Sequence, residues 1–216
     1  MAYGLYEGRM KEAIHALKYD RLHPAARGLG RMLAVAMAQL AGDAPGEMLV
    51  VPVPLHRSRR TQRGFNQARL LAAEALAVLR RSHPAWKLTL AASTLMRLRA
   101  TESQAGLTPH QRRVNVRGAF SVSDSAAVAG KDILLVDDIL TTGATARAAS
   151  RALLRAGAAS VRVATLARAR RASGLVPGES WGYVENISKP AGNVPADVMQ
   201  GASALSPYSS QDQPSF

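Results

Sequence analysis

The chain has 216 residues, no cysteine and a formal net charge of +13. This length allows one domain with a sizeable core, and the lack of cysteine excludes a disulfide framework and a thiolate zinc site. No apolar run approaches the roughly 18 residues that span a membrane, and the first residues lack the apolar centre of a signal peptide. We therefore expect a soluble, cytoplasmic protein without membrane insertion.

The charge is distributed unevenly along the chain. Residues 172–216 carry a balance of −3, which leaves +16 on residues 1–171. A folded unit this basic attracts polyanions such as nucleic acid or phosphorylated small molecules. A basic surface that only maintains solubility explains the charge equally well, so the charge alone does not define a function.

The hydrophobic pattern predicts alternating helices and strands. In chain order we expect helices over 8–19 and 24–42, a strand over 48–55, a helix over 66–81, strands over 87–93 and 132–137, a helix over 143–156 and a strand over 161–167. Such alternation with short connections is typical of an α/β fold with a central, mostly parallel sheet flanked by helices.

Two segments lack a sustained period. Residues 97–117 hold five arginines, and residues 172–216 are rich in Ser, Pro, Gly and Gln. We expect one domain over 1–171, with a helical N-terminal part over 1–46 and no zinc module. The segment 172–216 has the composition of a disordered tail.

The stretch DILLVDDILTTGAT (132–145) contains two adjacent carboxylates at the predicted end of a buried strand, Asp137 and Asp138. Ligands of open parallel sheets bind at the carboxyl ends of the strands. Two carboxylates there can accept hydrogen bonds from a vicinal diol. An aspartate that only caps a helix is the alternative, but capping needs one carboxylate and not two.

A turn of small residues follows and leads into the helix predicted over 143–156. It comprises Thr141, Thr142, Gly143, Ala144 and Thr145. Backbone N–H groups at such a helix start converge on one point, with the positive end of the helix dipole, and this suits a phosphate. A phosphate beside a diol describes a ribose 5-phosphate.

A basic connection follows the strand predicted over 48–55. Its four arginines are Arg57, Arg59, Arg60 and Arg63. Guanidinium groups suit a pyrophosphate, Gly64 permits a close backbone approach, and Asn66 could cap the next helix. The alternative is a solvated basic turn.

The stretch 132–145 resembles the 5-phosphoribosyl 1-pyrophosphate (PRPP) motif of type I phosphoribosyltransferases, which has four apolar residues, two acids, two further residues and Thr-Thr-Gly-x-Thr. The resemblance implies a type I phosphoribosyltransferase-like fold. It also implies that Asp137 and Asp138 hold the ribose hydroxyls as the catalytic pair, and that residues 141–145 bind the 5′-phosphate.

Three further segments are similar to the ComF family of competence-associated, amidophosphoribosyltransferase-like proteins. They are VPVPLHRSRRTQRGFNQA (51–68), RLRATESQAGLTPHQRRVNVRGAF (97–120) and YEGRMKEAIHALKY (6–19). The resemblance covers about residues 3–168. The chain departs from the family in having no cysteine, where members commonly begin with a four-cysteine zinc module, and in continuing well past the last predicted strand.

The resemblance assigns roles to both basic segments. Pyrophosphate would be bound by Arg57, Arg60, Arg63 and Gly64. Residues 97–117 would form a mobile loop that closes over PRPP, with Arg97, Glu102, Gln104, Arg112 and Arg113 as its candidate residues. Simple surface charge explains Arg112 and Arg113 equally well.

The implied function is binding of PRPP with Mg²⁺, without zinc and without a protein metal site. If the protein is an enzyme, an unidentified acceptor displaces pyrophosphate from the anomeric carbon; no residue is an obvious general base. The alternative is a non-catalytic protein that binds single-stranded DNA and a helicase-like competence ATPase. A second copy of the chain is a further candidate partner.

Overall fold

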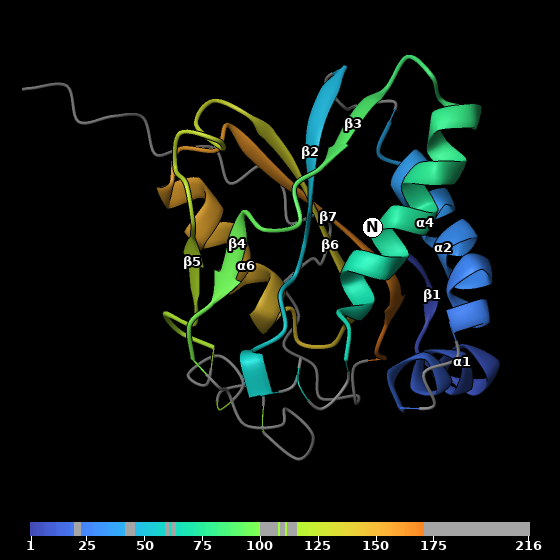
Figure 1. Cartoon of the computed structure of the whole chain (residues 1–216). Coiled ribbons are helices and arrows are strands. Elements are labelled where there is room, and N and C mark those ends of the chain that lie inside the picture. Colours follow the sequence, from blue (N-terminus) through green and yellow to red (C-terminus); the bar gives the residue numbers. More distant parts are fainter. Residues whose placement is uncertain are drawn as a thin grey trace, which may run out of the picture.

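A five-stranded parallel sheet runs through the middle of the molecule (Figure 1). Its order is β1 (Ala2–Leu5), β7 (Ser160–Arg168), β6 (Asp132–Leu140), β2 (Glu47–Pro52) and β3 (Lys87–Leu90). The computed structural model describes residues 1–19, 23–41, 46–58, 61, 64–99, 108, 111 and 116–170. The expected tail over 172–216 lies outside these residues.

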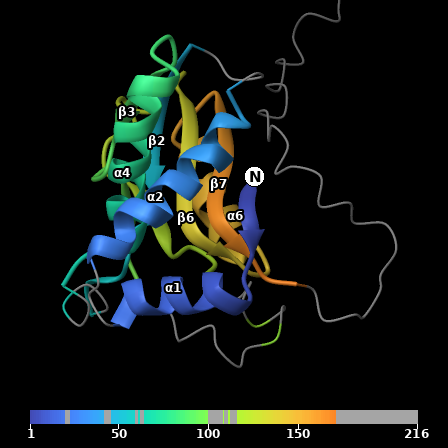
Figure 2. The same cartoon turned by 90° about the vertical axis from the view of Figure 1, so that its right-hand side faces the viewer.

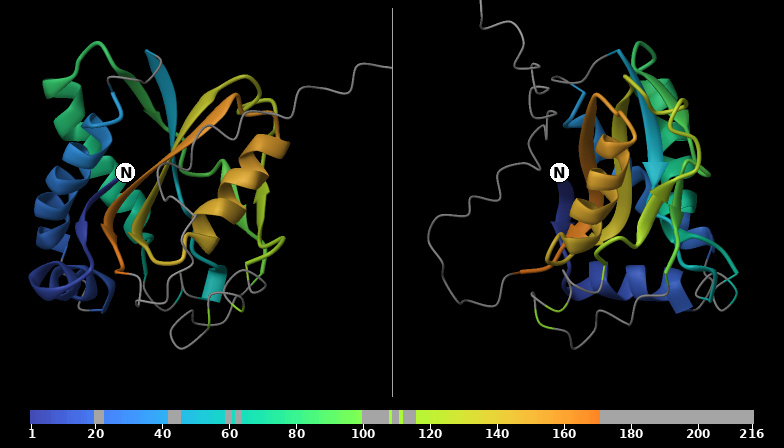
Figure 3. Two further views of the ribbon diagram at one scale, coloured as in Figure 1. Left: turned by 180° about the vertical axis from the view of Figure 1, so that it is seen from behind. Right: turned by 90° about the vertical axis from the view of Figure 1, so that its left-hand side faces the viewer.

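Helices cover both faces of the sheet, as the α/β prediction requires (Figures 1 and 3). One face packs against α2 (His23–Ala38) and α4 (Gln67–Ser82), and the other packs against α6 (Ala144–Arg155). Alternate residues of the central strand serve the two cores: Leu134 and Val136 point to α2 and α4, and Ile133 and Leu135 point to α6. This alternation follows from the two-residue period of a strand.

The first helix, α1 (Gly8–Tyr19), lies crosswise at the carboxyl end of the sheet (Figure 2). Its apolar residues Ile14 and Leu17 are fully buried in the core that α2 and α4 share. This packing directs the last turn of α1 toward the sheet edge at which parallel strands bind ligands.

Beside α6, two short strands form an antiparallel pair, which we name the β4–β5 ribbon (Leu95–Arg97 and Phe120–Val122). The sequence did not predict this ribbon, because three-residue strands are too short to show a period. Leu95 and Phe120 are buried in the α6-side core. The ribbon therefore anchors both ends of the arginine-rich segment predicted as a loop.

Two other differences from the sequence prediction concern the central sheet. The strand β1 was not predicted, and it forms an edge of the sheet by pairing in parallel with β7. The strand β6 was expected to end at Asp137, but it continues to Leu140 and pairs with β7 up to Arg168. The two aspartates therefore lie within the paired part of β6 and not beyond its end. No helix in the described part of the chain is long and apolar enough to cross a membrane.

Candidate ligand-binding site

A pocket of about 180 Å³ lies at the carboxyl end of β6. Its walls come from the end of α1, the connection between β2 and α4, the β4–β5 ribbon, the end of β6 and the start of α6. The charged side chains in its lining are Lys18, Arg97, Asp137 and Asp138. The pocket therefore contains two carboxylates and two cations that come from three separate elements.

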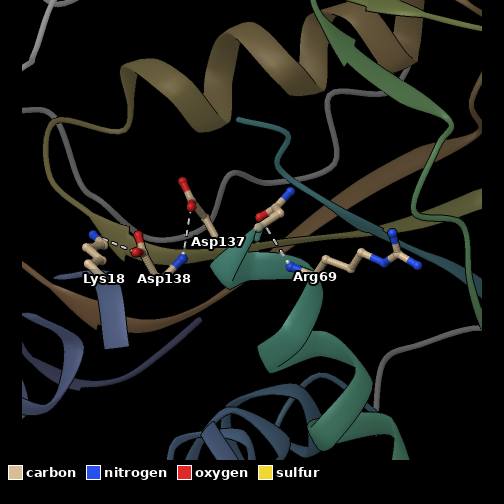
Figure 4. Close-up of polar contacts among 5 residues, drawn as sticks. Lys18, Arg69, Asp137 and Asp138 are labelled. Atoms are coloured by element: carbon tan, nitrogen blue, oxygen red, sulfur yellow. Dashed lines mark hydrogen bonds and ion pairs between the residues drawn. The ribbon is translucent and has the colours of Figure 1, made fainter. Parts of the chain in front are cut away.

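The two aspartates leave β6 on opposite faces of the sheet, because they are consecutive residues of a strand. Asp137 follows the alternation of Ile133 and Leu135 toward the α6 side, and Asp138 points to the α1 side. The backbone N–H of Asp138 donates a hydrogen bond to Oδ1 of Asp137 at 2.9 Å (Figure 4). This bond fixes the orientation of the Asp137 carboxylate.

Burial and, to a smaller extent, the negative charge of Asp138 raise the pKa of Asp137 from an ordinary value of 3.8 to about 7. The hydrogen bond from the Asp138 N–H and the charges of Lys18 and Arg97 act in the opposite direction. Desolvation wins because it disfavours the charged form more than the cations favour it. Asp137 therefore changes its charge near neutral pH.

A lysine from α1 forms an ion pair with one of the two aspartates of the pocket. Nζ of Lys18 lies 2.5 Å from Oδ2 of Asp138, and the two side chains are only 17% and 14% exposed (Figure 4). The sequence pattern did not mark Lys18 as a site residue. Its only sequence signal is its place in the last turn of a predicted helix, and which partner it meets depends on how α1 packs.

The turn after β6 is held in shape by its own hydrogen bonds. Gly143 has a φ of 70° and precedes the first residue of α6, so it occupies the left-handed region that glycine tolerates. Oγ1 of Thr142 accepts a hydrogen bond from the Ala144 N–H at 3.4 Å, and the Thr142 carbonyl accepts one from Arg147 at 2.6 Å. The half-buried Arg147 thus supports the turn.

Four of the five predicted phosphate-binding residues line the pocket: Thr141, Gly143, Ala144 and Thr145. Thr142 is not among the lining residues, and its hydroxyl is engaged with the start of α6. The positive end of the α6 dipole faces the pocket from this side. The arrangement suits an anion next to the two aspartates.

The connection between β2 and α4 forms another wall. Asn66 accepts a hydrogen bond from the Arg69 N–H at 3.4 Å and donates one to the Val53 carbonyl at 3.1 Å. This confirms the predicted helix cap and ties α4 to the end of β2. Of the predicted pyrophosphate ligands, Arg57 is exposed and Gly64 has a φ of 79°, and neither lines the pocket. Arg60 and Arg63 lie outside the described residues.

Of the five candidate residues named for the mobile loop, the structure describes Arg97 alone. It belongs to β4 and not to a loop, its guanidinium lies 5.4 Å from the ring centre of Phe120, and it lines the pocket. Glu102, Gln104, Arg112 and Arg113 lie outside the described residues. Arg97 therefore enters the site as part of a folded ribbon.

The described residues include no group of three or more His, Cys, Asp or Glu side chains that could hold a metal ion. Mg²⁺ needs few protein ligands when a phosphorylated substrate supplies oxygens.

Comparison with known proteins identifies the class to which this fold and pocket belong. A family model described as "Phosphoribosyl transferase domain" matches residues 63–196. The DNA utilization protein YhgH of Salmonella typhi is 36% identical over 157 residues, which cover 72% of this chain and 65% of that protein. The chain thus spans slightly less than two thirds of the first curated relatives that it matches. Competence protein F of Haemophilus influenzae is 30% identical over 169 residues, covering 77% and 71% of the two chains.

The parallel sheet, its flanking helices and the family match define a phosphoribosyltransferase fold. The chain belongs to the ComF family. Among solved structures, it is similar to the glutamine phosphoribosylpyrophosphate amidotransferase of B. subtilis complexed with ADP and GMP. That structure is 26% identical, with a TM-score of 0.39, and the similarity covers 65% of this chain and 26% of that one.

Proposed function

We propose that this protein binds PRPP together with Mg²⁺ in the pocket at the carboxyl end of β6. The observation that carries the proposal is that one pocket joins the two carboxylates of β6 to the N-terminal end of α6. The carboxylates would accept hydrogen bonds from the ribose hydroxyls. The backbone N–H groups near Gly143 would bind the 5′-phosphate.

In this proposal the pyrophosphate of PRPP lies next to Arg97. It lies in the pocket lining on the β4–β5 ribbon, on the same side of the sheet as Asp137. A guanidinium group there would stabilise negative charge that develops on a departing pyrophosphate. Bound Mg²⁺ would supply additional charge neutralisation to the pyrophosphate.

Phosphoribosyl transfer is the reaction that this binding mode serves. An acceptor nucleophile would form a bond to the anomeric carbon as the bond to pyrophosphate breaks. The protein would hold the sugar through Asp137 and Asp138 and exclude water from the reacting carbon. The acceptor is identified by screening candidate nucleophiles for release of pyrophosphate.

Calorimetry with PRPP and Mg²⁺ tests the binding proposal. We expect wild-type protein to bind and the double variant Asp137→Asn, Asp138→Asn to lose binding, because neutral amides hold the diol less strongly than carboxylates. The matched control is Asp124→Asn, since Asp124 is exposed and only holds the Ala126 N–H in a turn. Unchanged PRPP affinity in a folded double variant contradicts the ribose assignment.

A second candidate function is binding of single-stranded DNA, with a helicase-like ATPase as partner. The names of the relatives, which refer to DNA utilization and competence, and the charge of +16 on residues 1–171 favour it. These names also support a role of the chain in DNA uptake. Phosphate contacts made by basic side chains bind DNA without sequence preference and weaken as salt rises.

Fluorescence anisotropy with a labelled single strand tests this candidate at several salt concentrations. Neutralising Arg57, Arg59 and Arg60 together should reduce the slope of log K against log salt by about two to three. Saturating PRPP should compete, because its pyrophosphate would occupy Arg97 at the same end of the sheet. DNA binding that is insensitive both to PRPP and to the three substitutions would show that these arginines do not bind DNA.

A further inference from the structure

The acidic side of the pocket is built by two elements that lie far apart in the sequence. Lys18 in the last turn of α1 reaches Asp138 near the end of β6, with Nζ and Oδ2 2.5 Å apart (Figure 4). Both side chains line the pocket and both are largely buried. An ion pair at this depth is screened less by water than one on the surface.

The ion pair between Lys18 and Asp138 offsets the repulsion between two neighbouring carboxylates. Asp137 and Asp138 are consecutive, so their charges repel, and burial penalises both. The cations that face the pair among the described residues are Lys18 from α1 and Arg97 from β4. Lys18 forms its ion pair with Asp138, on the face of the sheet opposite to Arg97.

We infer that Lys18 is a positioning residue of the ligand site, which holds the Asp138 carboxylate on the α1 side of β6 and offsets the charge of the aspartate pair. This inference rests on the proposed binding of a ribose diol. Lys18 holds one oxygen of Asp138 and the Asp138 N–H holds Oδ1 of Asp137, so among the described residues the second oxygen of each carboxylate is left for hydroxyl donors. The helix α1 is then part of the ligand site and not only of the core.

The inference predicts how the charge of Asp137 responds to loss of the lysine. The positive charge of Lys18 lowers the pKa of Asp137, against the raising effects of burial and of Asp138. Replacement of Lys18 by methionine removes that charge while keeping an unbranched side chain. The protonated form of Asp137, which is already substantial at pH 7, should then increase.

The experiment follows the carboxyl carbons of ¹³C-labelled aspartate by NMR in the full-length, ligand-free protein. The signal of Asp137 is assigned by its loss in Asp137→Asn. Lys18→Met should raise the Asp137 midpoint by about one pH unit, and Lys18→Arg, which keeps the charge, should restore the wild-type value. The matched control is Lys11→Met, because Lys11 is an exposed lysine of the same helix. Lys18→Gln serves as a second neutral variant if Lys18→Met does not fold.

The same variants are titrated with PRPP and Mg²⁺ at pH 7 and pH 9. If ionised Asp137 is the form that accepts the hydroxyls, Lys18→Met should bind about fivefold more weakly at pH 7, or weaker still. Part of this loss should persist at pH 9, where Asp137 is ionised in both proteins, because the Asp138 carboxylate is no longer held by Lys18. Affinity equal to that of the wild type at pH 9 would reject the positioning role. An unchanged midpoint, or wild-type affinity of Lys18→Met at pH 7, overturns the inference.

The two readouts separate this inference from the proposed function. If the wild-type protein does not bind PRPP, the proposed function is wrong. The midpoint of Asp137 in the ligand-free protein still decides whether Lys18 offsets the charge of the pair. If the wild type binds PRPP and the neutral variants behave like the wild type in both measurements, only the role of Lys18 is rejected.

Discussion

Asp137 makes the stability of the ligand-free protein depend on pH. Its pKa is raised to about 7 in the folded chain, whereas an aspartate in the unfolded chain loses its proton near 3.8. At pH values between these two pKa values, Asp137 binds a proton when the chain folds. At low pH the group therefore does not lower the free energy of unfolding by its charge. As the pH rises from about 4 to about 7, ionised Asp137 lowers the free energy of unfolding progressively. Above that range its effect is constant.

The substitution Asp137→Asn should stabilise the ligand-free protein, because an amide has no charge to desolvate. Its advantage over wild type should grow by roughly 2 kcal/mol between pH 5 and pH 7.5. Urea denaturation at the two pH values measures this difference. An advantage that is equal at both values would show that Asp137 is already ionised in the folded protein.

The sequence predicted the acidic pair but not its cationic neighbour on α1, Lys18. Asp137 and Asp138 stand out because two carboxylates beside a buried strand are costly without a ligand or a partner. Lys18 is one of several lysines and arginines in the first helix, and nothing local marks it. Its role follows from the crosswise packing of α1, which is a property of the folded chain.

The helices α2 and α4 approach each other closely at Gly30. A Cβ atom added to Gly30 would overlap the Cβ of Glu74 on α4. Replacing Gly30 by alanine should therefore push the helices apart and destabilise the protein by about 1–3 kcal/mol, the usual range for overpacking. Thermal or urea denaturation gives the change in the free energy of unfolding.

Gly28 provides the control on the same helix. No heavy atom lies within 4 Å of a Cβ added there. Gly28→Ala should stabilise the protein by about 0.5–1 kcal/mol, because alanine loses less conformational freedom in a helix than glycine does. Equal effects of the two substitutions would mean that the contact with Glu74 does not limit the packing of α2 on α4.

The long periodic elements were predictable and the short ones were not. The pattern predicted α4, α6 and β7 to within one or two residues, because each has a clear apolar face or an apolar run. The strand β1, with sequence AYGL, and the three-residue strands of the β4–β5 ribbon have no period to detect. Their pairing is decided by partners that are distant in the sequence.

The extent of the domain remains a prediction that truncation can test. The family match runs to residue 196, whereas the composition predicts a domain that ends near residue 171. Because residues 172–216 have no amphipathic period, deleting them should change the melting temperature by less than roughly 5 °C and leave PRPP binding unaffected. Deleting residues 197–216 alone is the matched control. A large drop in the longer truncation only would assign residues 172–196 to the folded unit.

The pairing of distant segments also has a consequence for protein synthesis. The strand β1 pairs with β7, and Lys18 of α1 contacts Asp138 of β6, so on the ribosome the first contact must wait for residues 165–168 and the second for residue 138. Chains whose contacts join distant positions fold slowly and expose strand edges in the meantime. A nascent chain therefore emerges with its first strand unpaired, and the pocket is completed only after β6 and the start of α6 have left the exit tunnel.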